Sequence, residues 1–89
     1  MTQRYQTTAA SGDSAAFTTG GDTIFQLDTE DKDAVVNILA RVDVGAKWVS
    51  VAELRSPVNL SARLAYYPQF MISVTRNTEG KTLTVWSDV

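Results

Sequence analysis

Residues 47–54 read KWVSVAEL, and this run of alternating apolar and polar residues decides the fold class. It follows the turn-like sequence DVGA at 43–46. Alternation with a period of two is typical of a β-strand that places one face in a core. Trp48 lies near the start of the run, where an aromatic side chain is expected to flank a hairpin and to pack. The pattern therefore predicts a β-hairpin whose second arm is residues 47–54.

Two later runs, at 70–76 and 81–87, repeat this alternation. Their expected inner faces carry Phe70, Ile72 and Val74 in the first run and Leu83 and Val85 in the second. Trp86 falls on the opposite face of the second run, exposed to solvent or covered by the N-terminal segment. Residues 77–80 supply a turn, in which Gly80 suits a positive φ. We expect the two runs to pair as a hairpin.

Residues 34–44 fit two patterns. A helix would align Val35, Ile38, Leu39 and Val42 behind a cap at Thr29, whereas a strand would align Val36, Ile38, Ala40, Val42 and Val44. Because β-branched residues are frequent and a short glycine-containing link leads into 47–54, the strand is favoured. Its even-numbered side chains from 36 to 44 would then face the core.

The other segments complete an all-β chain of five to seven short strands. The sequence GGD at 20–22 marks a turn into a strand at 23–27, and 61–66 is a further candidate strand. Pro57 favours a loop or an edge, and the bond before Pro68 is open to either isomer. We predict a small antiparallel β-sandwich or barrel over 22–89.

The N-terminal segment 1–21 departs from this pattern. It is rich in Thr, Ala, Ser and Gly, and Phe17 is the only large apolar residue between 6 and 21. Such a segment has little to bury and much backbone entropy to lose on ordering. We expect a flexible arm, or a docking arm that orders on a neighbouring subunit with Tyr5 and Phe17 as anchors.

Amino-acid composition and charge disfavour several classes of function. The 89 residues include no Cys and no His, which removes the usual general base, the thiol nucleophile and the common zinc ligands. A net charge of −2 with dispersed Lys and Arg gives no field for a phosphate backbone. No apolar run reaches membrane-spanning length, and the first six residues are not followed by an apolar segment, so we expect no secretory signal. We expect no enzyme activity, no nucleic-acid partner, no membrane partner and synthesis in the cytoplasm.

One acidic cluster, at 28–33, invites a calcium hypothesis. It reads DTEDKD, with four carboxylates in six residues. An EF-hand loop needs Gly at its sixth position and Glu at its twelfth, where this chain has Asp33 and Leu39. A solvated connector that keeps a sheet edge from pairing is favoured, and no cofactor is expected. Neighbouring carboxylates in one loop also seldom form an opposed acid and base.

The order of these features resembles small β-sandwich accessory proteins of tailed-bacteriophage virions. The resemblance covers roughly 23–87 and is carried by VNILARVD at 36–43, KWVSVAEL at 47–54, FMISVT at 70–75 and VWS at 85–87. That group has a D-G-x-x-W type of turn between two strands. Here the turn reads DVGAKW at 43–48, with one residue between Asp and Gly.

The resemblance implies a non-enzymatic virion protein, a capsid decoration or a head-fibre or tail component assembled in the host cytoplasm. Its partners would be copies of itself, with a trimer favoured, and the major capsid protein or another virion protein. Aromatic anchors for these contacts would be Phe17, Tyr66, Tyr67 and Trp86. The alternative is a carbohydrate or cell-surface binding module, with Tyr66, Tyr67 and Trp86 as a stacking platform.

Overall fold

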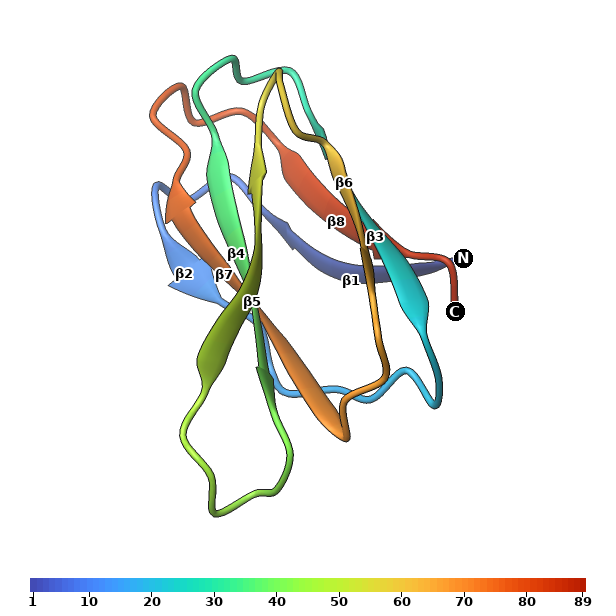
Figure 1. The fold of residues 1–89 in the computed structure, drawn as a ribbon. Helices are drawn as coiled ribbons and strands as arrows, with labels where there is room; N and C mark the ends of the chain where they lie inside the picture. The colour runs from blue at the N-terminus through green and yellow to red at the C-terminus, as the bar shows by residue number, and fades with distance from the viewer.

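Eight β-strands and no helix make up the computed structural model, which describes residues 1–89 (Figure 1). The strands are β1 (Thr2–Thr7), β2 (Gly12–Asp13), β3 (Thr23–Thr29), β4 (Val35–Arg41), β5 (Val49–Arg55), β6 (Ser61–Leu64), β7 (Gln69–Arg76) and β8 (Leu83–Ser87). They form two antiparallel sheets, in the orders β1-β8-β3-β6 and β2-β7-β4-β5. The predicted small antiparallel β-sandwich is confirmed. No helix is present that could cross a membrane.

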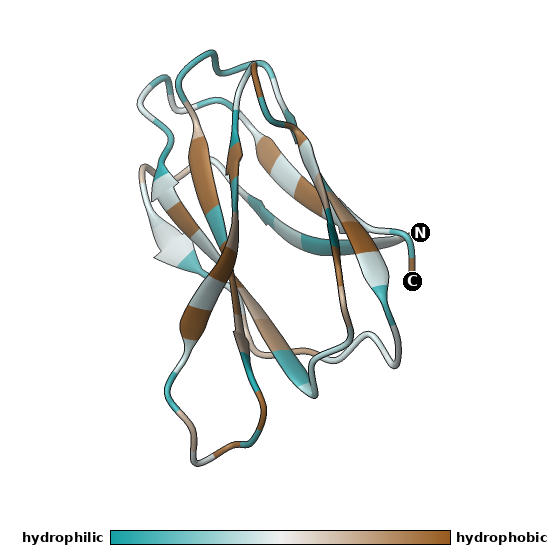
Figure 2. Cartoon of the chain, viewed as in Figure 1, coloured by the Kyte–Doolittle hydropathy of each residue, from teal (hydrophilic) through white to brown (hydrophobic).

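The core lies between the two sheets. It is built from the residues that face inward at alternate positions along the strands. Figure 2 shows the resulting bands of hydrophobic and hydrophilic residues along the strands. The fully enclosed side chains include Phe25, Leu27, Val36, Ile38, Leu54, Phe70, Ile72, Leu83 and Val85. The predicted inner faces of 70–76 and 81–87 are therefore confirmed, and so is the outward position of Trp86.

Residues 34–44 are a strand over most of their length. β4 is a central strand that pairs with β5 on one side and β7 on the other. Val36, Ile38 and Ala40 are fully buried, as the even-numbered pattern predicts. Val42 and Val44 do not follow it, because β4 ends at Arg41 and both side chains are exposed in the β4–β5 connection.

The expected hairpin between 70–76 and 81–87 does not form. β7 pairs with β2 and β4, whereas β8 pairs with β1 and β3 in the opposite sheet. The 77–82 connection therefore crosses from one sheet to the other. The buried Asn77 amide fastens this crossing by donating to the backbone carbonyls of Lys81 at 2.9 Å and Ala9 at 3.3 Å. Gly80 has the expected positive φ, of 65°.

The first 21 residues belong to the sandwich and do not form a separate arm. β1 pairs along β8, and β2 pairs with β7. Phe17 exchanges two backbone hydrogen bonds with Phe70, at 2.8 and 2.9 Å. Its ring lies 6.1 Å from the rings of both Phe25 and Phe70. Two aromatic side chains, those of Phe17 and Tyr5, and the β1 and β2 ladders thus hold a segment whose composition alone suggests disorder.

Phe17 and Tyr66 provide a paired test of these positions. Phe17→Ala should lower the free energy of unfolding by about 2 kcal/mol, because the ring packs against the core. Tyr66→Ala should lower it by less than about 1 kcal/mol, because that side chain is largely exposed. Urea unfolding followed by circular dichroism measures both values. Equal, small losses would contradict the core role of Phe17.

Candidate functional site

An open hollow of about 670 Å³ lies on the outer face of the β1-β8-β3 side of the sandwich, beside Trp86. Its lining residues are Gln6, Asp28, Thr29, Glu30, Gly80, Lys81, Thr82, Thr84 and Trp86. Trp86 is the only hydrophobic residue among them, and it is half-buried. The hollow therefore combines one flat aromatic surface with amide, hydroxyl, carboxylate and ammonium groups.

Strand register positions the side chains around Trp86. Gln3 of β1 and Gln26 of β3 pair with Trp86 from either side. The next row joins Gln6, Thr84 and Asp28 across the same three strands, and the Gln6 amide donates to the Thr84 hydroxyl at 3.0 Å. Because neighbouring residues in register place side chains on one face, these polar groups surround the indole on a rigid surface.

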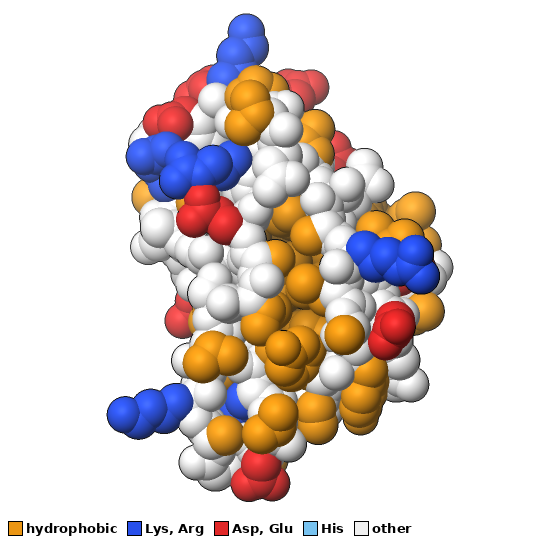
Figure 3. All heavy atoms as spheres, in the orientation of Figure 1, with side chains coloured by type: hydrophobic (Ala, Val, Ile, Leu, Met, Phe, Trp, Pro, Cys, Tyr) orange, Lys and Arg blue, Asp and Glu red, His pale blue; other side chains and the backbone are white.

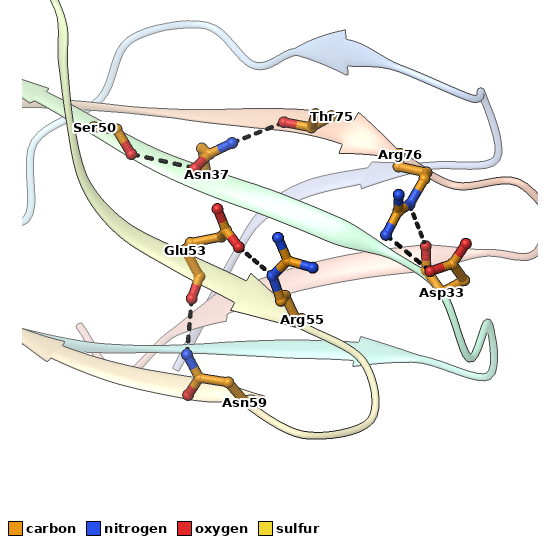
Figure 4. A network of polar contacts seen from close by, with 8 residues as sticks. All are labelled: Asp33, Asn37, Ser50, Glu53, Arg55, Asn59, Thr75 and Arg76. Carbon is orange, nitrogen blue, oxygen red and sulfur yellow. Dashed lines mark hydrogen bonds and ion pairs between the residues drawn. The ribbon is translucent and has the colours of Figure 1, made fainter.

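The acidic segment 28–33 divides its carboxylates between two roles. Asp31 is buried, and its carboxylate oxygens accept hydrogen bonds from the backbone N–H groups of Asp33, at 2.7 Å, and Glu79, at 3.0 Å. Asp33 binds Arg76, with a side-chain contact of 2.8 Å (Figure 4). Asp28 and Glu30 are exposed and line the hollow. Two carboxylates thus fasten loops, and two face the solvent at the hollow.

Hydrogen bonds from backbone N–H groups lower the pKa of two carboxyl groups, those of Asp31 and Asp88. The Glu79 N–H is the largest of several contributions that lower the pKa of Asp31 below its usual 3.8. Asp88 accepts the Ile24 N–H at 2.8 Å and the Thr23 hydroxyl at 2.7 Å, and these bonds lower the pKa of Asp88. Both groups link segments that are distant in sequence. No group of three His, Cys, Asp or Glu side chains could hold a metal ion.

A second surface, which we call the seam, runs between the edge strands β5 and β6. Ala52 and Ala62 occupy inner positions there, opposite the fully buried Ile38 and Phe25 in their ladders. Both alanines are only partly buried against the core, so the short side chains leave an apolar inner surface partly open between these edge strands. Figure 3 shows a band of hydrophobic side chains between the two sheets on this side. Other apolar members are Val49, Val51, Leu64 and Tyr67.

One half of the β5 edge beside the seam is closed by Asn59. Its backbone exchanges two 2.8 Å hydrogen bonds with Arg55, and its amide donates to the Glu53 carbonyl at 2.8 Å (Figure 4). Glu53 and Arg55 also form an ion pair. The stretch 49–52 has β4 on one side and no strand on the other. The N-terminal half of β5 is therefore an open sheet edge next to an apolar band.

The four aromatic residues predicted as anchors lie in three environments. Phe17 and Tyr67 are partly buried around Phe70, with the Tyr67 ring 5.8 Å from it. Tyr66 is 48% exposed. Trp86 lies on the outer face of β8, away from the other three. The structure thus brings Phe17 and Tyr67 together in the packing of the core and does not assemble the platform of Tyr66, Tyr67 and Trp86.

Sequence reasoning missed the polar partners of Trp86. Gln6 fell in the presumed arm, and Asp28 fell in the presumed connector. In the sequence, apolar Phe25 and Leu27 alternate with polar Gln26 and Asp28, and this alternation could have placed Asp28 on an outer face. No local signal relates Gln6 to Thr84, which is 78 residues away.

The two lowered pKa values predict acid sensitivity. Because the folded carboxyls bind protons less readily than the unfolded ones, the unfolded chain gains protons first as the pH falls. The free energy of unfolding should be steady above about pH 5 and should decline as the pH drops through 3.8 and below. Urea unfolding of Asp31→Asn should show a smaller acid-dependent decline. Asp13→Asn, which removes an exposed carboxyl group on β2, is the matched control for the substitution itself, and an unchanged decline in Asp31→Asn would contradict the assignment.

Comparison with known proteins adds no relative. The chain matches no protein-family model, no curated protein and no solved structure. Any function assigned to it therefore rests on its own sequence and on its two surfaces, the hollow and the seam.

Proposed function

We propose that this chain is a non-enzymatic structural protein of a tailed-bacteriophage virion, a capsid decoration or a head or tail accessory component. It acts through contacts with copies of itself, a trimer being favoured, and with the major capsid protein or another virion protein. The class comes from the sequence resemblance. The observation that supports a contact-based role is the seam, where an apolar band adjoins an open strand edge.

The seam suits strand addition. An incoming strand would pair with the free backbone groups of 49–52 and insert alternate apolar side chains over Ala52 and Ala62. Backbone hydrogen bonds would supply affinity, and the side chains in the seam would supply selectivity. A chain of 89 residues has a small core, so burial of the seam would also add stability to the assembled form.

Val49 provides the sharpest test of this role. It is 54% exposed at the inner edge of β5, so Val49→Lys should leave the fold intact. A charge on an edge strand opposes strand addition, so the variant should lose self-association that the unmodified chain has. Light scattering coupled to size-exclusion chromatography measures the mass of each. The matched control is Ile24→Lys, which changes a residue that is 43% exposed on the other sheet.

The expected result is an oligomer for the unmodified chain and for Ile24→Lys, and a monomer for Val49→Lys. Thermal melting of each variant checks that the mass change does not come from unfolding. A chain that stays monomeric at high concentration, or oligomers of equal mass in all three proteins, would contradict self-assembly through the seam.

A further inference from the structure

We propose that the hollow beside Trp86 is a binding site for a neutral saccharide. This inference does not depend on the virion role, because it concerns a different face of the molecule. Trp86 is a large apolar side chain on the outer face of β8, and every other residue that lines the hollow is polar or glycine. Gln3 and Gln26 flank Trp86 in register. On the side away from the hollow, Trp86 also borders Met1 and Ile24, which line a smaller depression of about 100 Å³. The indole therefore has polar neighbours on the side of the hollow and apolar neighbours toward the chain ends.

The indole suits one face of a sugar ring. A pyranose presents C–H groups on its faces and hydroxyl groups around its edge, and an aromatic ring surrounded by polar groups complements both. Trp86 is held on β8, the strand that lies between β1 and β3 in its sheet. A platform fixed on a strand loses little conformational entropy when a ligand binds.

The polar lining matches sugar hydroxyls, each of which donates and accepts hydrogen bonds. Asp28 and Glu30 supply acceptors, and neither belongs to any of the three ion pairs of the molecule. Gln6 supplies an exposed amide and Thr82 an exposed hydroxyl, whereas Thr84 is 4% exposed and its hydroxyl accepts a hydrogen bond from the Gln6 amide. Carboxylates and amides that can engage two hydroxyls at once are strong partners for polyols.

The charges that line the hollow favour a neutral ligand over an anionic one. The lining carries two carboxylates, Asp28 and Glu30, against one ammonium group, on Lys81. Lys81 is in addition paired with Glu79 at 3.4 Å. The hollow therefore repels sulfated, sialylated or phosphorylated sugars. Its volume of about 670 Å³ falls within the range of about 300–1,000 Å³ typical of small-molecule sites.

The test measures binding of four neutral oligosaccharides to the full chain: maltotetraose, cellotetraose, chitotetraose and mannotetraose. A heparin tetrasaccharide is the anionic control. Isothermal titration calorimetry gives affinities. The second tryptophan provides the matched variant, because Trp48 lies outside the hollow with the Arg41 guanidinium 4.2 Å from its ring centre.

We expect the unmodified chain to bind at least one neutral oligosaccharide and to bind it more tightly than heparin. Trp86→Ala should weaken binding about tenfold or more, as loss of a central aromatic anchor does, whereas Trp48→Ala should leave it unchanged. Trp86→Phe and Asp28→Asn change less volume, and should weaken binding measurably even if Trp86→Ala fails to fold. No binding of any neutral probe, tighter binding of heparin, or equal losses in the Trp48 and Trp86 variants would overturn the proposal.

Discussion

The contact between Phe25 and Phe70 is the interaction on which the rest of the structure depends. The two rings belong to opposite sheets and meet edge to face at 5.2 Å, where both side chains are fully buried. Phe17 and Tyr67 pack around the same centre. Because the aromatic cluster draws one ring from the N-terminal segment, it orders that segment, and the segment in turn contributes β1 and β2. An N-terminal segment with few large apolar side chains, chiefly those of Tyr5 and Phe17, is thereby incorporated into the sandwich.

Alternation in the sequence correctly predicted the buried faces of β7 and β8, and that of β4 as far as Ala40. In β5 a register irregularity opposite Ile38 and Leu39 interrupts the alternation. Alternation did not predict which strands are neighbours. A period of two determines the face that a side chain occupies, but the same pattern satisfies pairing within one sheet and packing across two sheets. The 77–82 connection looked like a hairpin turn for this reason. The buried Asn77 amide distinguishes a crossing from a hairpin, and its partners become apparent only in three dimensions.

The candidate hollow was predictable in one residue only. Trp86 was expected on an outer face because Leu83 and Val85 take the inner one, and the structure agrees. Lys81 and Thr82 lie close to Trp86 in sequence, but Gln6 and Asp28 come from β1 and β3, far from it. The sequence interpretation had assigned Gln6 to an arm and Asp28 to a connector. The division within 28–33 was equally hidden. Asp31 is buried and accepts hydrogen bonds from the backbone N–H groups of Asp33 and Glu79. The nearby carboxylate of Asp28 faces solvent.

The seam and the hollow differ in chemistry and position, so one small protein can use both surfaces at the same time. The seam follows the edge strands β5 and β6, whereas the hollow lies over β1, β8 and β3. A copy joined at the β5 edge would extend the β2-β7-β4-β5 sheet and leave the outer face of the other sheet uncovered. Assembly would then repeat the hollow once per subunit. Because several weak sites on one particle bind a multivalent surface far more tightly than one site does, modest affinity at each Trp86 would suffice.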